Sequence, residues 1–177
     1  MPLRRLHSSS LPAGRMQSAQ RHLVLLRHSK SAWPDGVPDL RRPLAKRGRR
    51  DAAAVGCWLR EHAPRLDAVV CSPAERARQT WTLVAAELDD PPPPSYDERV
   101  YGATATQLLA LVRNLPDEID TAVLVGHNPD LQELAALLTG QEVEMKTSAV
   151  AVVAWPGRWD NTGPGTMLLR HHATPRG

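Results

Sequence analysis

Aromatic residues are scarce in this sequence, which has five Trp, two Tyr and no Phe among 177 residues. The length suits one domain with a sizeable core, and that core must be built from Leu, Val and Ala. Cysteine is scarce too: Cys57 and Cys71 are the whole complement and form no C-x-x-C pair. This excludes a disulfide framework and a cysteine zinc site, and it is typical of a reduced, cytoplasmic protein.

Long apolar runs are also lacking, since no segment approaches the ~18 residues that suggest a membrane-spanning helix. Only three of the 22 basic residues are Lys, and the net charge is +3. The basic clusters are short, at residues 4–5, 41–42 and 46–50, whereas a nucleic-acid binder usually concentrates its charge on one face. We interpret most of them as solvated, and expect neither nucleic acid nor membrane as a partner.

The first twenty residues are polar and basic, with no periodic pattern. They also lack the apolar central segment of a secretory signal. We expect residues 1–20 to form a disordered tail and residues 21–177 to form a single domain. Met16 is an alternative start, because the periodic sequence begins only a few residues after it.

Strand and helix patterns alternate along the rest of the chain. Continuous aliphatic runs typical of strands buried on both faces occupy residues 22–26, 66–71 and 121–125. Helical patterns occupy residues 46–62, 74–88, 104–113 and 129–138. Two later runs, at 149–155 and 166–170, are predicted to pair like a hairpin. This order predicts an α/β fold: a three-layer sandwich whose mostly parallel central sheet has helices on both faces.

Proline residues predict two helix starts and one stiff connector. Ser72 and Asn128 each precede a proline at a predicted helix start, so we expect them to act as helix N-caps. The four prolines at 91–94 are interpreted as a stiff connector rather than a domain boundary.

Polar side chains follow each of the three buried runs. Arg27 and His28 follow the first, Arg76 stands one helical turn after the second, and His127 follows the third. Ligands of open α/β sheets bind at the carboxyl ends of the strands, so these four side chains are expected to meet. Taken alone, each side chain could have an ordinary structural role. Arg76, for example, could be one of several exposed helical arginines, like Arg78. The agreement of three strands favours a shared site.

Two arginines and two histidines together suit a phosphoryl group. Guanidinium groups bind phosphoryl oxygens in pairs, and helix N-termini add backbone donors. A neutral imidazole can attack phosphorus near pH 7. The second imidazole, if protonated, would stabilise charge on the transferring group.

The same segments resemble a known family. L-R-H-S-K-S at 26–31 is similar to the R-H signature of the histidine phosphatase (phosphoglycerate-mutase-like) superfamily. Together with R-R-P-L at 41–44, C-S-P-A-E-R-A-R-Q-T at 71–80 and V-G-H-N-P at 125–129, it resembles the SixA-type phosphohistidine phosphatase branch. The likeness runs in order from about residue 22 to about residue 154 and implies the histidine phosphatase fold.

The resemblance also implies roles for individual residues. His28 would be the nucleophile that becomes a phosphohistidine, and Arg27 and Arg76 would bind the phosphoryl oxygens. His127 would be the second pocket histidine, catalytic and phosphate-binding. E-R-V-Y-G at 98–102 is similar to a mutase motif whose Glu is the proton donor, which makes Glu98 the candidate general acid. No metal and no cofactor is implied.

Departures from the mutase pattern bear on the substrate. Ser29, Lys30 and Pro34 stand where mutases carry Gly, Glu and Asn, and the chain is short for the mutase insertions. We therefore expect a phosphatase for phosphorylated protein side chains, phosphohistidine included, or for small phosphorylated metabolites. A sugar-phosphate phosphatase or mutase, and a non-catalytic module that binds phosphorylated partners, remain open alternatives. The sequence leaves the oligomeric state undefined.

Two further features are interpreted as structural. Arg42 is expected to hold a carboxylate or carbonyl groups, and residues 147–149 to lead into a late strand.

Overall fold

A computed structural model describes residues 20–176; residues 1–19 and 177 lie outside the described part, and so does nearly all of the predicted tail. The strands are β1 (Arg21–Arg27), β2 (Ala68–Cys71), β3 (Pro94–Tyr96), β4 (Thr121–Gly126), β5 (Val150–Trp155) and β6 (Leu168–Ala173). The helices are α1 (Lys46–His62), α2 (Glu75–Ala85), α3 (Ala105–Arg113) and α4 (Asp130–Thr139). Short 3-10 turns are η1 (Asp39–Arg41), η2 (Glu98–Val100) and η3 (Trp159–Asn161).

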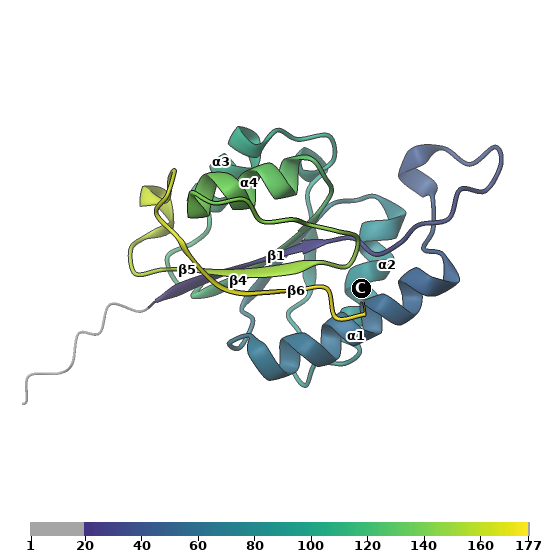
Figure 1. The fold of residues 1–177 in the computed structure, drawn as a ribbon, viewed down its shortest axis with the longest axis horizontal. Coiled ribbons are helices and arrows are strands. Elements are labelled where there is room, and N and C mark those ends of the chain that lie inside the picture. Colours follow the sequence, from purple (N-terminus) through teal and green to yellow (C-terminus); the bar gives the residue numbers. More distant parts are fainter. Residues whose placement is uncertain (1–19, 177) are drawn as a thin grey trace, which may run out of the picture.

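All six strands form one sheet in the order β3-β2-β4-β1-β5-β6. The pairs β2–β3, β2–β4 and β1–β4 are parallel, whereas β5 is antiparallel to both β1 and β6. Helices α3 and α4 cover one face of the sheet, and α1 and α2 cover the other (Figure 1). The predicted three-layer α/β fold is confirmed, and so is the hairpin-like pairing of the last two strands.

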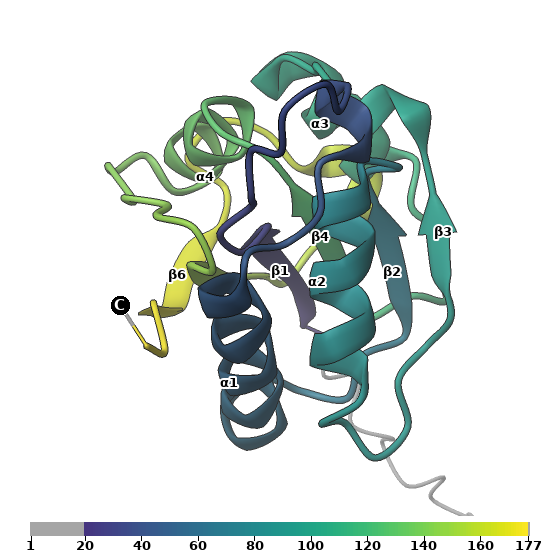
Figure 2. The same cartoon turned by 90° about the vertical axis from the view of Figure 1, so that its right-hand side faces the viewer.

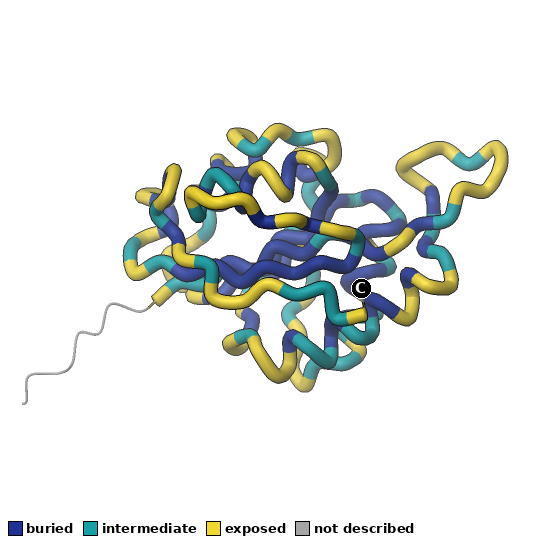
Figure 3. Tube along the Cα trace, viewed as in Figure 1, coloured by how far each residue is buried: buried dark blue, intermediate teal, exposed yellow. Residues whose placement is uncertain are grey.

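The sheet separates two hydrophobic cores. Because strand side chains alternate between faces, Leu23 and Leu25 of β1 pack with α3 and α4, whereas Val24 and Leu26 pack with α1 and α2. Leu, Val and Ala supply most of the buried apolar residues, as expected from the scarcity of aromatics, and Trp81 and Trp159 are the largest fully buried side chains. The buried strands and the exposed outer loops are seen together in Figure 3.

The structure adds one strand that was not predicted and corrects one local prediction. The last proline of the 91–94 run begins β3, a strand that we did not predict and that pairs with β2 at the edge of the sheet. An edge position tolerates proline, because one side of the strand needs no backbone donor. The expected caps also fail: α2 begins at Glu75 and α4 at Asp130, so Ser72 and Asn128 stand outside the cap positions. No described helix is long and apolar enough to cross a membrane.

The carboxyl edge of the parallel strands is packed tightly against α1. Lys30 O accepts the backbone N–H of Ala45 at 2.8 Å, just before the first turn of α1. Gly48 lies in that turn, and a Cβ there would stand 2.1 Å from Lys30 O. Glycine therefore allows the segment after β1 to approach the helix.

We predict that Gly48→Ala lowers the free energy of unfolding by about 1–3 kcal/mol, the usual cost of overpacking. Helix propensity alone predicts the opposite sign, because Ala is favoured over Gly in a helix by about 1 kcal/mol. Denaturant unfolding of this variant beside Arg49→Ala, an exposed change in the same turn, measures the effect. A more stable Gly48→Ala protein would contradict the close approach.

Candidate active site

The four side chains predicted to meet do lie together, at the carboxyl edge of the parallel strands. The backbone N–H of His28 donates to Gly126 O at 3.0 Å, which ties the end of β1 to the end of β4. Ser72 N–H donates to Val125 O at 3.0 Å and joins β2 to the same edge. Figure 2 views the molecule from this side, with the loop between β1 and α1 in front.

His28 is buried, with only 8% of its surface exposed. Its Nδ1 lies 2.8 Å from Ser29 O, and because a carbonyl oxygen only accepts, Nδ1 carries the proton. The lone pair of the neutral ring is therefore on Nε2. Burial, opposed by the hydrogen bond to Ser29 O and aided by the nearby His127, Arg76 and Arg27, lowers the pKa of His28 to about 3. The imidazole is neutral at pH 7, the form that can act as a nucleophile.

His127 faces the same space, with its ring centroid 5.1 Å from that of His28. Its Nε2 lies 2.7 Å from Ser72 Oγ. Burial, followed by the nearby charge of Arg76, lowers the pKa of His127 to about 4. A protonated second imidazole, which the sequence left open, is therefore disfavoured near pH 7 in the free protein.

The two arginines are held by different segments of the chain. Arg27 donates from Nη1 to Met145 O at 2.9 Å, and its buried Nε has no hydrogen-bond partner within the described residues. Burial lowers the pKa of Arg27, but a guanidinium remains charged in proteins. Arg76 is buried, whereas its near twin Arg78 is exposed with its guanidinium 4.0 Å from the Tyr96 ring centroid. The structure thus brings Arg76, not Arg78, to the histidines.

A chain of buried hydroxyl groups supports the segment that carries His28. Ser148 donates its backbone N–H to His28 O at 3.2 Å, and its Oγ donates to Ser29 Oγ at 2.7 Å. Ser29 N–H in turn donates to Thr80 Oγ1 at 3.0 Å. Ser148 adopts a φ of 65°, which is uncommon for a residue with a side chain. The structural role expected for residues 147–149 is therefore a specific one: Ser148 holds the backbone beside His28.

Sequence reasoning missed Asp39 and Tyr101, which both reach this site. Asp39, in η1, accepts from Arg76 twice: Nη1 donates to its main-chain O at 2.8 Å and Nη2 to Oδ2 at 3.1 Å. Tyr101 OH donates to Asp39 Oδ2 at 2.6 Å, and the Tyr101 ring lies edge-on to His127 with centroids 5.7 Å apart. Sequence signals existed for both: Asp39 stands i,i+3 to Arg42, a spacing that pairs side chains on a helical face, and Tyr101 lies in the E-R-V-Y-G motif, from which only Glu98 was chosen.

Arg42 has the structural role that its position suggested. It donates from Nη1 to Asp39 Oδ1 at 2.8 Å, from Nε to Ala32 O at 3.1 Å, and also to Ser31 Oγ. Its guanidinium lies 3.2 Å from the centroid of the exposed Trp33 ring. Arg42 thereby fixes the loop that carries Asp39.

Glu98, the candidate general acid, lies at the start of η2 and is exposed. Within residues 20–176, no hydrogen bond or ion pair links its carboxylate to the two histidines or the two arginines. The next residues of the same motif bring Tyr101 into the site instead. The acid role of Glu98 stays a prediction.

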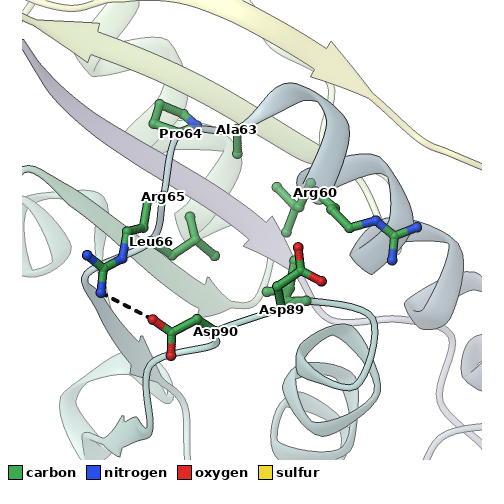
Figure 4. A pocket seen from close by; sticks show the side chains of 9 residues that line it. Arg60, Ala63, Pro64, Arg65, Leu66, Asp89 and Asp90 are labelled. Carbon is green, nitrogen blue, oxygen red and sulfur yellow. Dashed lines mark hydrogen bonds and ion pairs between the residues drawn. The ribbon is translucent and has the colours of Figure 1, made fainter.

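A surface pocket lies away from this site, at the opposite end of the strands, where the amino end of β2 meets the end of α1 (Figure 4). Its lining includes Arg60, Leu66 and Asp89, together with an ion pair of 3.2 Å between Arg65 and Asp90. None of the residues at the carboxyl edge contributes to it. Over the described part of the chain, no group of three or more His, Cys, Asp or Glu side chains could hold a metal ion.

The sequence profile of the histidine phosphatase superfamily (branch 1) matches residues 23–123. The chain belongs to this superfamily. The uncharacterized protein Rv1276c of Mycobacterium tuberculosis is 39% identical over 162 residues, covering 85% of this chain and all of the relative. The uncharacterized chloroplastic protein At3g52155 of Arabidopsis thaliana is 32% identical, covering 98% of this chain and 86% of the relative.

Solved structures show the same fold. A protein from Nakamurella multipartitia named as a SixA phosphohistidine phosphatase superposes with a TM-score of 0.77 at 29% identity, covering 87% of this chain and 95% of that one. A protein histidine phosphatase SixA bound to tungstate superposes with a TM-score of 0.76 at 23% identity, covering 88% and 97%. The SixA-type resemblance expected from the sequence is confirmed, and the superfamily and the first of these structures support a phosphatase.

The buried neutral histidines of this histidine phosphatase give a pH-dependent stability. Both folded-state pKa values lie below the ordinary 6.5, so the unfolded chain binds protons that the folded chain excludes. We predict that the free energy of unfolding decreases as the pH falls from about 6.5 towards 4, by up to ~1.4 kcal/mol per pH unit for each imidazole.

Urea unfolding at several pH values measures this slope. In His28→Asn the amide can still donate to Ser29 O but does not titrate, so its slope is expected to be shallower than that of the wild-type protein. Equal slopes for the two proteins would show that His28 is not held in the neutral form.

Proposed function

We propose that this protein is a metal-independent phosphatase that transfers the phosphoryl group of its substrate to Nε2 of His28 and then to water. The observation that carries the proposal is the neutral, buried His28 ring, whose Nδ1 proton is bound to Ser29 O. That hydrogen bond directs the lone pair of the ring to Nε2. A nucleophile prepared in this way, beside two guanidinium groups, suits attack on phosphorus.

In the first step, His28 Nε2 forms a bond to phosphorus while the bond from phosphorus to the leaving atom breaks, and the leaving atom takes the electron pair. The phosphorylated imidazole becomes positively charged, and Ser29 O stabilises it through the Nδ1 proton. In the second step a water oxygen attacks phosphorus, the P–N bond breaks, and neutral His28 is regenerated with release of phosphate. Arg27 and Arg76 would hold the phosphoryl oxygens in both steps, and donors of this kind stabilise the transition state.

We propose His127 as a neutral donor to the phosphoryl group, with Ser72 fixing its orientation through Nε2. A phosphoryl dianion between the two rings would favour protonation of His127, so the ring can gain positive charge when substrate binds. Glu98 is proposed as general acid for ester substrates. General acid help contributes ~10²–10⁴-fold, and its exposed position implies that it would act on a leaving group outside the pocket.

We propose phosphorylated protein side chains, phosphohistidine included, as the substrate class, with small phosphorylated metabolites as the alternative. The proposal rests on the resemblance to the SixA type and on the exposed aromatic and apolar side chains of Trp33, Leu40 and Tyr101 on loops around the site.

We also propose that residues 21–177 act as a single domain, because one sheet supplies every strand of the site. The free thiols of Cys57 and Cys71 suit a reducing compartment, and we propose the cytoplasm.

Hydrolysis of p-nitrophenyl phosphate in the presence of EDTA tests the reaction. We predict turnover by the wild-type protein, and a loss of about a thousandfold or more in His28→Ala, the scale seen when a catalytic nucleophile is removed. His171→Ala, a histidine change on the exposed strand β6, is the matched control and should retain wild-type turnover.

Circular dichroism of His28→Ala establishes that the variant is folded. Turnover that depends on a metal, or that survives in folded His28→Ala, would refute the proposed reaction. Binding of phosphorylated compounds without turnover would instead favour a phospho-binding module.

A further inference from the structure

The Asp39 carboxylate is held by three side chains around the site. Arg42 Nη1 donates to Oδ1 at 2.8 Å, while Arg76 Nη2 and Tyr101 OH donate to Oδ2 at 3.1 Å and 2.6 Å. The hydrogen bond from Tyr101, followed by Arg76 and Arg42, lowers the pKa of Asp39 to about 2 in spite of partial burial. The group is therefore an anion at pH 7, in direct contact with an arginine that is proposed to bind phosphate.

Asp39 lies on the open side of the proposed reaction centre. His28 is 8% exposed, whereas the Asp39 side chain is 47% exposed and Tyr101 is 38% exposed. In phosphoryl transfer the attacking and leaving atoms stand roughly in line on opposite sides of phosphorus. A nucleophile on the buried side therefore places the leaving group on the open side, where Asp39 and Tyr101 lie.

An anion in this position is unfavourable for most phosphate esters. Like charges a few ångströms apart repel each other, and Asp39 shares Arg76 with the phosphoryl dianion that would bind there. A positively charged leaving group would instead be attracted to Asp39, which offsets the repulsion between Asp39 and the phosphoryl dianion. A carboxylate offers about four acceptor positions, and the three hydrogen bonds to Arg42, Arg76 and Tyr101 leave one for an N–H donor of the substrate.

We propose that Asp39 is a specificity-determining residue that selects phosphoryl groups attached to a protonated nitrogen base, such as an N-phosphorylated imidazole or guanidine, over phosphate esters. The inference rests on the proposed function, because it assumes transfer of the phosphoryl group to His28. On this proposal, the loop between β1 and α1 recognises the leaving group, whereas the strand ends recognise the phosphoryl group.

The transfer step balances without a general acid when the substrate is an N-phosphorylated imidazolium. Asp39 accepts a hydrogen bond from the ring nitrogen that does not carry phosphorus. Nε2 of His28 forms the new P–N bond while the old P–N bond breaks, and its electron pair stays on the leaving nitrogen. The leaving imidazole departs neutral, with its proton on the nitrogen that faces Asp39. An exposed Glu98 without a link to the site is consistent with such a reaction.

The test compares kcat/KM for two substrates, N-phosphohistidine and p-nitrophenyl phosphate, in the wild-type protein, Asp39→Asn and Asp35→Asn. Asp35 is the matched control, because it is an exposed aspartate of the same loop and the substitution removes the same charge. We expect Asp39→Asn to lower kcat/KM for N-phosphohistidine about ten- to a hundredfold, the loss of one hydrogen bond to a charged group. Its kcat/KM for p-nitrophenyl phosphate should stay equal or rise, and Asp35→Asn should match the wild-type protein for both.

Other outcomes overturn the proposal. If Asp39→Asn lowers kcat/KM equally for both substrates, Asp39 only orients Arg76. If kcat/KM is unchanged for both substrates, Asp39 has no part in substrate recognition. Equal changes in kcat/KM for Asp35→Asn and Asp39→Asn would show that only the loss of a negative charge matters, and not the position of Asp39. The proposed function is tested separately: a wild-type protein that hydrolyses neither substrate, or does so without His28, would fail that proposal before any comparison of variants.

Discussion

Parallel pairing of β1 with β4 is the constraint on which the site depends. The two strands run side by side in register, with Arg27 opposite Gly126, so they end together and place His28 and His127 at one edge. Pairing of β2 with β4 brings Ser72 and the start of α2 to the same edge. A shift of one residue in either pairing would exchange the side chains of the strand between the two cores and separate the strand ends. The register of these pairings therefore fixes the position of the site.

Burial of the reactive groups has a cost, and backbone carbonyl groups offset part of it. Two imidazoles and two guanidinium groups lie close together with little exposure to water, which disfavours their charged forms. Carbonyl oxygens of Ser29, Met145 and Asp39 accept hydrogen bonds from His28, Arg27 and Arg76. Both imidazoles respond to burial by remaining neutral. The same desolvation that opposes folding at low pH keeps His28 available as a nucleophile.

Every strand except β3, and the residues that follow the buried strands, could be predicted from the sequence, because aliphatic runs define strands buried on both faces and parallel strands share an edge. Arg27, His28, Arg76 and His127 were found in this way. Asp39 and Tyr101 were not, because Asp39 lies in a short 3-10 turn held by Arg42 and Arg76, and Tyr101 reaches the site through its hydrogen bond to Asp39. The N-cap predictions failed for a related reason. The Asn128 amide donates to Met145 O, and Ser72 Oγ, which accepts the N–H of Ala74 just before α2, also binds His127 Nε2.

The central claim is that His28 carries the phosphoryl group during turnover. It is tested most directly by mixing the protein with p-nitrophenyl phosphate, quenching within milliseconds in alkali, in which phosphohistidine persists, and locating the phosphoryl group by mass spectrometry. The account predicts one phosphoryl group, on His28, that forms and disappears at rates compatible with turnover. Turnover without a phosphorylated His28, or a phosphoryl group on His127 instead, would contradict it.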